Sequence, residues 1–341
     1  MKALQYRRFG AGPEVVEIDR PAPGPGEVLV KITASGICHS DEHIMSLPAE
    51  HFPYAMPQTL GHEPAGTVAG FGAGVTGIGL DTPVIVYPPW GCGRCATCAD
   101  GTENLCLTGM TAPGLGSPGA MAEYMIVDDV RHLVPIGDLD PVSAAPLTDA
   151  ALTSYQAIKS VMHQFVAGST TVVIGAGGLG HMAIQLLRAL TGTRVIALDL
   201  GEARLAFARE VGAHAAVESD RAAAATVKEM TGGRGASVVL DFVGTDATGK
   251  LAVACGGVGS SVVVIGAGGG AVSVGLTRSP LNMTVSTSFW GRRQELIELV
   301  AMARRGQISV RTTTFPLDEG PRAYELLRRG EIRGRGVIVP A

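Results

Sequence analysis

The sequence has little charge and no long apolar segment at its start. Charged residues make up 17% of the 341 residues, and the net charge is −4. Partners such as nucleic acid or an anionic membrane favour a strongly basic surface, so this composition argues against both. The first twenty residues hold no apolar stretch of the signal-peptide type, and the chain has no tandem repeat or low-complexity tract. We therefore expect a globular, cytoplasmic protein, long enough for two domains.

One uncharged run, residues 251–277, is long enough to span a bilayer. It contains eight glycines, and its apolar residues are mainly valine. This composition is typical of buried parallel strand and turns rather than of a membrane helix.

The two halves of the chain differ in composition and in their expected pattern of secondary structure. Residues 1–147 hold most of the 20 prolines and many short strand-like pieces, which indicates a β-rich domain. Between about 150 and 290, strands and helices alternate, which predicts an α/β fold with a doubly wound parallel sheet. The predicted strands are 170–177, 193–199, 236–244 and 260–268, and the predicted helices are 178–190, 202–211 and 221–230. Two more helical segments, 292–306 and 319–330, precede a terminal strand at 335–340.

The heptapeptide VVIGAGG occurs twice, at residues 172–178 and 263–269. Only the first copy is followed by apolar residues at helical spacing, and it forms the pattern G-x-G-x-x-G before a second strand. In such a unit the turn and the helix N-terminus bind a dinucleotide pyrophosphate. The residues that we assign to this turn are Gly175, Gly177, Gly178, Leu179 and Gly180. The second copy has no helix after it, so it is not a second pyrophosphate site.

The cofactor preference depends on Asp199, which ends the next strand 19 residues after Gly180. A carboxylate there accepts hydrogen bonds from the adenosine ribose and repels a 2′-phosphate, which favours NAD over NADP. Arg204, five residues later, is a further candidate for contact with the ribose.

Four of the six cysteines are crowded together, with the spacing C-x2-C-x2-C-x7-C: Cys92, Cys95, Cys98 and Cys106. Four thiolates close a tetrahedral shell around zinc and leave no position for substrate, so we expect a structural zinc site. An iron–sulfur cluster or a disulfide-stapled loop are the alternatives, and neither a second cysteine cluster nor a secretion signal supports them.

A second, dispersed set of residues is suited to a catalytic zinc. Cys38 and His62 are zinc-ligand types outside the cysteine cluster, and Asp149 is a candidate third ligand near the expected domain boundary. Glu63 is a possible outer or transient ligand, and Asp41 a possible acceptor for the second ring N–H of His62.

With these motifs in this order, the chain resembles the zinc-dependent medium-chain alcohol dehydrogenases, and especially bacterial NAD-dependent secondary alcohol dehydrogenases. The resemblance rests on GICHSDEH, LGHEPAGTV, the four-cysteine lobe, PLTDAALTSY and VVIGAGGLG. It implies a GroES-like β-rich catalytic domain at 1–150 and 291–341, and a Rossmann NAD-binding domain at 151–290. It also implies two zinc ions per chain, NAD(H), an alcohol or ketone substrate, and a homodimer or homotetramer.

The resemblance assigns roles to further residues. Ser40 takes the substrate proton, and His43 is the outer base of a relay that runs through a cofactor ribose hydroxyl. His39 and Arg335 contact the pyrophosphate, and the backbone at Ile265 and Gly266 meets the nicotinamide carboxamide. Asp149 stands where animal-type members have cysteine. Tyr54, Leu115 and Trp290 match positions that line the substrate cleft.

Three alternatives remain open from the sequence. The chain could be another dehydrogenase of this fold, acting on a polyol, threonine or formaldehyde. A zinc-free quinone reductase is disfavoured by the cysteine lobe and by the pair Cys38 and His62. A non-enzymatic zinc- and nucleotide-binding protein is disfavoured by the open zinc site beside Ser40 and His43.

Overall fold

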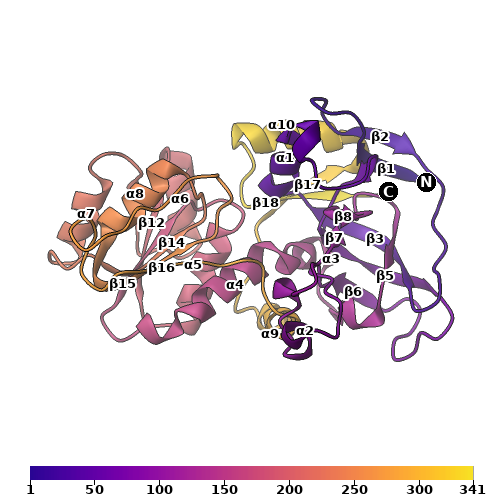
Figure 1. Ribbon diagram of the computed structural model, residues 1–341, viewed down its shortest axis with the longest axis horizontal. Coiled ribbons are helices and arrows are strands. Elements are labelled where there is room, and N and C mark those ends of the chain that lie inside the picture. Colours follow the sequence, from indigo (N-terminus) through magenta and orange to yellow (C-terminus); the bar gives the residue numbers. More distant parts are fainter. Residues whose placement is uncertain (341) are drawn as a thin grey trace. The chain divides into compact units, whose positions relative to one another are not determined.

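The computed structural model describes residues 1–340 and divides into two compact units (Figure 1). Unit 1 comprises Met1–Leu152 and Gly291–Ala341, and unit 2 comprises Thr153–Trp290. Over the described residues, no helix is long and apolar enough to cross a membrane.

Unit 2 is built on one six-stranded sheet in which every pairing is parallel. The spatial order is β13-β12-β11-β14-β15-β16. The central strands are runs of buried valine, isoleucine and leucine, as expected for a sheet with both faces covered. The strands are β11 (Thr170–Ile174), β12 (Arg194–Asp199), β13 (Ala215–Glu218), β14 (Ala236–Asp241), β15 (Gly256–Val264) and β16 (Thr284–Thr287). The helices are α5 (Gly180–Leu190), α6 (Glu202–Glu210), α7 (Ala223–Met230) and α8 (Asp246–Cys255), with the short η5 (Met162–Gln164). The predicted α/β fold is confirmed.

The uncharged run at 251–277 is partly helical, which corrects the expectation of strand and turns alone. Its first five residues are the end of helix α8, which a Thr245 capping box begins. Gly249 lies inside this helix and weakens the helical pattern. Strands β13 and β16 were not predicted either, because each has four residues and none of those residues is buried.

Unit 1 contains a seven-stranded sheet in the order β10-β6-β5-β3-β18-β17, with β9 also paired to β3. Its strands are β3 (Val28–Gly36), β5 (Glu63–Phe71), β6 (Pro83–Val86), β9 (Tyr124–Val127), β10 (Leu133–Pro135), β17 (Thr312–Pro316) and β18 (Arg335–Val339). A three-stranded sheet joins β1 (Lys2–Tyr6) to β2 (Glu14–Glu17) and β4 (Gln58–Thr59), and β7 (Ala112–Pro113) pairs with β8 (Gly116–Ser117). The C-terminal strands β17 and β18 therefore belong to the same sheet as β3 and β5, far from them in the sequence.

The helices of unit 1 are short. They are α1 (His39–Ser46), α2 (Ala96–Ala99), α3 (Pro141–Ala144), α9 (Arg293–Arg304) and α10 (Gly320–Arg329), with η1 (Ala49–His51), η2 (Glu103–Leu105), η3 (Val130–His132), η4 (Ala145–Thr148) and η6 (Leu317–Glu319). Helix α4 (Ala150–Ser160) begins in unit 1 and continues the chain into unit 2. The yellow helix α10 lies beside the indigo helix α1, although they come from opposite ends of the chain (Figure 1).

The strand register of this sheet positions the candidate site. In the antiparallel pair β3 and β5, Gly36 lies opposite Glu63, so the end of β3 meets the start of β5. In the pair β18 and β3, Val337 lies opposite Gly36, so the start of β18 reaches the same place. The side chains just beyond these strand ends are therefore brought together.

Candidate active site

Cys38, His62 and Asp149 converge in unit 1. Cys38 follows β3, His62 precedes β5, and Asp149 follows η4. All three residues are buried, and their ligand atoms lie within 4.8 Å of one another. Asp149 Oδ2 is 3.6 Å from Cys38 Sγ and 3.7 Å from His62 Nε2.

These distances fit a zinc ion. Metal–ligand distances of about 2.0–2.3 Å in a tetrahedron place neighbouring ligand atoms about 3.3–3.8 Å apart. Both distances from Asp149 Oδ2 fall in that range. A thiolate, an imidazole and a carboxylate form a three-ligand set, which leaves the fourth position of a tetrahedron for substrate.

Asp41 orients His62, as the sequence predicted. Its Oδ1 lies 2.9 Å from His62 Nδ1, so Nε2 is the ring nitrogen that faces Asp149. Burial lowers the pKa of His62, but the charges and hydrogen bonds of Asp41 and Asp149 outweigh burial and raise it well above its usual value. The surroundings of this imidazole therefore favour a positive charge, which suits a metal cation.

Glu63 and Arg335 form a buried ion pair beside the three ligands. Arg335 Nε donates to both carboxylate oxygens of Glu63, at 2.9 and 3.0 Å, and Nη2 also contacts Glu63. Nη2 donates to Asp149 Oδ2 at 2.8 Å. Burial raises the pKa of Glu63 to about 7, although Arg335 opposes that shift. A side chain on Gly36 would overlap the Glu63 carboxylate, so the glycine makes room for this pair.

The position of Arg335 bears on its predicted contact with the cofactor. The residue is only 3% exposed, and its guanidinium is engaged by two carboxylates of unit 1. Contact with the pyrophosphate stays a prediction, and in this structure Arg335 is a partner of the candidate metal site.

Helix α1, which begins directly after Cys38, carries the residues predicted to transfer the substrate proton and to contact the cofactor: His39, Ser40 and His43. Ser40 Oγ lies 3.5 Å from Cys38 Sγ. His43, three residues on, is exposed, and residues at this spacing share one side of a helix. His39 is exposed at the start of the helix. The arrangement thus runs from a buried thiol to a solvent-facing imidazole.

The four clustered cysteines also converge, and their ligand atoms lie within 4.8 Å of one another. The Sγ atoms of Cys92 and Cys98 are 4.0 Å apart, and those of Cys95 and Cys106 are 3.8 Å apart. A tetrahedral zinc with Zn–S bonds of about 2.3 Å requires a separation of about 3.8 Å. The hydrogen bond with Thr97 contributes most to a pKa of about 5 for Cys95, which favours its thiolate. This lobe therefore fits a closed structural zinc site.

The candidate substrate residues lie in both units. Tyr54 is half-buried in unit 1, next to Gly116, which follows Leu115 in the chain. Burial raises the pKa of Tyr54, and His62 opposes this shift, so the phenol lies within electrostatic range of the candidate ligand. Trp290 is buried in unit 2 and has a positive φ of 50°. Their roles in a substrate pocket stay predictions.

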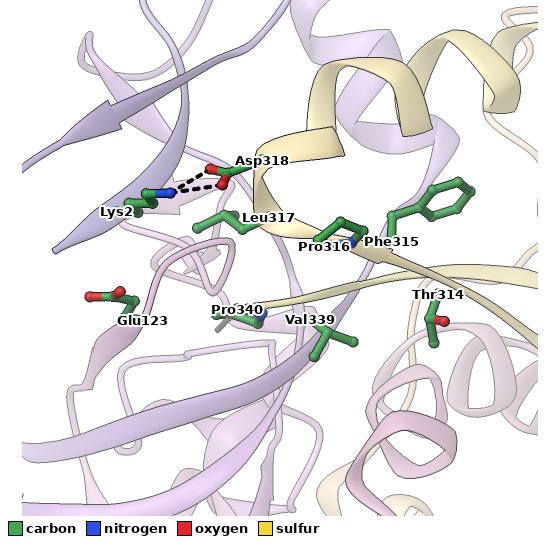
Figure 2. Close-up of a pocket in the computed structure, with 9 residues that line it drawn as sticks. All are labelled: Lys2, Glu123, Thr314, Phe315, Pro316, Leu317, Asp318, Val339 and Pro340. Atoms are coloured by element: carbon green, nitrogen blue, oxygen red, sulfur yellow. Dashed lines mark hydrogen bonds and ion pairs between the residues drawn. The ribbon is translucent and has the colours of Figure 1, made fainter.

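A separate hollow of about 340 Å³ in unit 1 contains none of the predicted site residues. Figure 2 shows the Lys2–Asp318 ion pair at its side, with Pro316, Leu317 and Val339 nearby. The candidate active site is therefore defined by its ligand atoms rather than by this hollow.

The glycines in and just after the first heptapeptide have different physical roles in unit 2. Gly175 has φ of 86°, a conformation that L side chains rarely adopt. A side chain on Gly180 would overlap the Gly175 carbonyl oxygen, whereas one on Gly177 would meet open space. Gly178 and Leu179 lead into α5, and Leu179 is its N-cap residue. These are the properties of a turn that admits pyrophosphate to its backbone.

Asp199 fixes this turn from the end of β12. Its Oδ2 accepts the N–H of Ala176, and its Oδ1 accepts the N–H of Leu200, both at 2.7 Å. Arg204 Nη1 is 3.3 Å from Asp199 Oδ1. The carboxylate predicted to bind the ribose thus also holds the backbone of the glycine-rich turn.

The second heptapeptide ends at the same edge of the sheet as the first. Ile174 of β11 lies opposite Asp241 of β14, which lies opposite Val264 of β15. The N–H groups of Ile265 and Gly266 donate to the Asp241 carbonyl oxygen, so the chain turns directly after the strand. One ligand along this edge of the sheet can reach both copies.

Comparison with known proteins agrees with these observations. The alcohol dehydrogenase GroES-like domain family matches residues 24–138, and the zinc-binding dehydrogenase family matches residues 178–305. D-arabinose 1-dehydrogenase (NADP(+)) of Saccharolobus solfataricus is 31% identical over 99% of this chain and 97% of its own length. NAD-dependent alcohol dehydrogenase of Sulfurisphaera tokodaii is 31% identical over the full length of both chains.

The chain belongs to the zinc-dependent medium-chain alcohol dehydrogenase family.

Solved structures extend this result to the fold. The alcohol dehydrogenase of the archaeon Aeropyrum pernix matches with a TM-score of 0.93 and 32% identity, with both chains fully covered. Acetophenone reductase from Geotrichum candidum, solved with NAD, matches with a TM-score of 0.86 and 31% identity over 99% of this chain and 97% of that one. The expected GroES-like and Rossmann folds are confirmed. The expected zinc agrees with the zinc-binding dehydrogenase family, and the expected NAD(H) agrees with the relatives named for NAD. The chain is therefore an oxidoreductase, and its relatives are dehydrogenases named for small molecules such as alcohols and a sugar.

Besides the contacts of Arg335, sequence reasoning missed a contact from helix α10 to the candidate metal site. The Tyr324 hydroxyl donates to Asp41 Oδ2 at 2.8 Å, across a sequence separation of 283 residues. The amphipathic pattern of residues 319–330 predicted the helix that carries Tyr324. No local signal indicated that its buried face reaches Asp41.

Proposed function

We propose that this chain is an NAD-dependent dehydrogenase that interconverts alcohols, chiefly secondary ones, with the corresponding ketones or aldehydes. The observation that carries the proposal is the convergence of Cys38, His62 and Asp149 at distances that suit zinc. In this proposal unit 1 is the catalytic domain and unit 2 is the NAD-binding domain.

The chain's own residues supply binding and proton transfer. A zinc ion held by Cys38, His62 and Asp149 would act as a Lewis acid that lowers the pKa of the substrate hydroxyl. Ser40, close to Cys38, receives the hydroxyl proton, and the exposed His43 exchanges it with solvent. Asp41 holds His62 in the tautomer that presents Nε2 to the site. Arg335, which is held by Glu63, donates to Asp149 and restrains it.

The cofactor proposal rests on unit 2. Bound NAD would accept the hydride at its nicotinamide ring. The open face of Gly177 leaves room for pyrophosphate, and the negative charge of Asp199 disfavours a 2′-phosphate. Contacts by His39 and Arg335 to the pyrophosphate, and by Ile265 and Gly266 to the carboxamide, belong to this proposal. Arg204 lies beside Asp199 and one relative is named as NADP-dependent, so the assay below compares NAD with NADP.

The substrate proposal rests on bulky side chains. Tyr54, Leu115 and Trp290 would narrow the site and favour small or flat secondary alcohols and ketones. The name of one relative, acetophenone reductase, supports a flat ketone, and that of another, D-arabinose 1-dehydrogenase, supports a sugar as the second candidate.

A substrate panel tests this function. Secondary alcohols, polyols, sugars, threonine and formaldehyde are each assayed with NAD and with NADP, by absorbance of the reduced cofactor, before and after chelation. The proposal predicts the highest kcat/KM for a secondary alcohol with NAD and loss of turnover after zinc removal. Faster turnover of a sugar or polyol would replace the substrate class, and turnover that survives complete zinc removal would overturn the mechanism.

The proposal also includes a homodimer or homotetramer in the cytoplasm. Strand β16 is an edge strand whose four residues are all exposed, and unpaired edges favour pairing with another chain. Val258 of the paired strand β15 is 75% exposed, and Leu276 and Leu281, just before β16, are 83% and 55% exposed. Val285→Lys should reduce the molecular mass of the particle in solution, measured by light scattering, and an unchanged mass would exclude this edge as the interface.

The proposed cytoplasmic location agrees with the cysteines. None of the six forms a disulfide, which suits a reducing compartment.

A further inference from the structure

We propose that Tyr324 is a positioning residue for the candidate catalytic zinc: its phenol fixes the Asp41 carboxylate, which in turn orients His62. The inference rests on the proposed function, because it assigns a role at the metal site described above. It assigns to the C-terminal helix α10 a part in organising ligands that lie near the N-terminus.

The contacts on Asp41 carry the argument. Oδ1 faces His62 Nδ1 at 2.9 Å, while Oδ2 accepts the Cys38 N–H at 3.0 Å and the Tyr324 hydroxyl at 2.8 Å. The carboxylate thus joins two of the three candidate ligands to Tyr324. Asp41 and Tyr324 are both 0% exposed, so water does not replace a lost partner easily.

A carboxylate that orients a ligand must itself be held. The terminal torsion of an aspartate is broad, so Oδ1 faces His62 reproducibly only if Oδ2 is fixed. The Cys38 N–H fixes Oδ2 from the helix N-terminus, and the phenol fixes it from a different element. Burial, and then the charge of Asp41, raise the pKa of Tyr324 well above its usual value, so the phenol remains a donor.

A purely structural role for Tyr324 is the rival explanation. Helix α10 is also tied to α1 by Arg328, whose Nε donates to Glu42 at 2.9 and 3.0 Å. If Tyr324 only docked α10, then loss of the Arg328 tie would disturb the metal site in the same way. If Tyr324 acts on Asp41, then removing its hydroxyl should disturb the metal site more than removing the Arg328–Glu42 contact.

The chain supplies a matched control in Tyr6. Its side chain is also fully buried and belongs to the same apolar cluster as Tyr324. Its hydroxyl donates at 3.0 Å to the Met45 carbonyl oxygen, not to Asp41. Tyr6→Phe therefore removes a comparable buried hydrogen bond without touching the residue that orients His62.

The experiment compares Tyr324→Phe, Tyr6→Phe and Arg328→Gln in the full-length protein. Zinc affinity at the three-ligand site is measured by competition with a chelator, and Co²⁺ bound there is monitored by its visible spectrum. For Tyr324→Phe we expect about tenfold weaker zinc binding, as for other outer partners of zinc ligands, and an altered Co²⁺ spectrum. The two controls should stay within about twofold of the wild type, given the weak coupling of residues without shared partners.

A double-mutant cycle tests the route through Asp41. Adding Tyr324→Phe to Asp41→Asn should cause no further loss of zinc affinity, because the other partner of the phenol, Met121 Sδ at 3.4 Å, is not one of the three candidate ligands. Three results would each overturn the inference: losses of zinc affinity that add in the double mutant, a wild-type zinc affinity in Tyr324→Phe, or an equal loss of zinc affinity in Arg328→Gln. The metal content of the wild type and of Cys38→Ala is compared before any Tyr324 variant is made. If the two contain the same amount of metal, the proposed function is wrong, whatever Tyr324 does.

Discussion

His132 is the residue whose replacement gives the sharpest stability prediction, because it joins the cysteine lobe to the rest of unit 1. Its ring is 0% exposed and stacks on Trp90, with centroids 5.7 Å apart and 13° between the planes. Nδ1 lies 2.6 Å from Asp128 Oδ1, and Nε2 lies 3.2 Å from Glu103 Oε2. Both ring nitrogens face carboxylates, which favours the protonated imidazolium.

We expect His132→Gln to lower the free energy of unfolding by about 2–4 kcal/mol. A hydrogen bond to a charged group contributes about 1.5–3 kcal/mol, and breaking a buried ion pair costs more than an exposed one. The Glu103 side chain is 10% exposed, so solvent screens its interaction with His132 little. The Asp128 side chain is 43% exposed, so solvent screens its contribution. For a unit of about two hundred residues, the loss corresponds to a Tm about 4–16 °C lower.

The pH dependence of this loss tests the assignment of charge. Burial lowers the pKa of His132, but hydrogen bonds to Asp128 and Glu103 raise it more, so the net pKa lies above its usual value. The stabilisation is therefore complete below about pH 6.5 and is lost as the pH rises through the folded-state pKa. Denaturant unfolding at pH 6 and pH 9 should show a smaller difference between wild type and variant at pH 9. A difference that is constant or grows with pH would refute the reasoning; His51→Gln, at an exposed histidine, is the control.

The remaining predictions concern the cofactor turn and proton transfer. Gly180→Ala should destabilise unit 2 by more than about 3 kcal/mol, because its methyl group overlaps a backbone oxygen, whereas Gly177→Ala should keep the wild-type Tm but bind NADH about tenfold more weakly. Equal Tm values for the two variants, read by calorimetry, would contradict this distinction. Asp199→Asn should raise the ratio of kcat/KM for NADP to that for NAD about tenfold, because it removes the charge that faces a 2′-phosphate; an unchanged ratio would exclude Asp199 as the discriminating residue. His43→Ala should slow turnover most at lower pH, and an unchanged pH–rate profile would remove His43 from proton transfer.

The parts of this protein that could be predicted are those set by local pattern. The spacing of the four cysteines indicates a metal lobe, and the glycines after β11 indicate a dinucleotide turn, because each function needs nearby residues. Cys38 and His62 were recognised as ligand types, but their proximity follows from the register that places Gly36 opposite Glu63.

The parts that could not be predicted depend on contacts between distant segments. Arg335 resembles a phosphate-binding residue in sequence, yet β18 places it against Glu63 and Asp149. Tyr324 belongs to an amphipathic helix, and only the packing of α10 on α1 brings it to Asp41. Helix α8 was missed because glycine and threonine weaken its helical pattern.

The most direct test of the central claim is a metal count joined to an activity assay on Cys38→Ala. The wild type should contain two zinc ions per chain and form NADH from a secondary alcohol. Cys38→Ala should retain one zinc, in the cysteine lobe, and should bind NADH normally but form none. Turnover by Cys38→Ala at the wild-type rate, or a second zinc retained in that variant, would contradict the account.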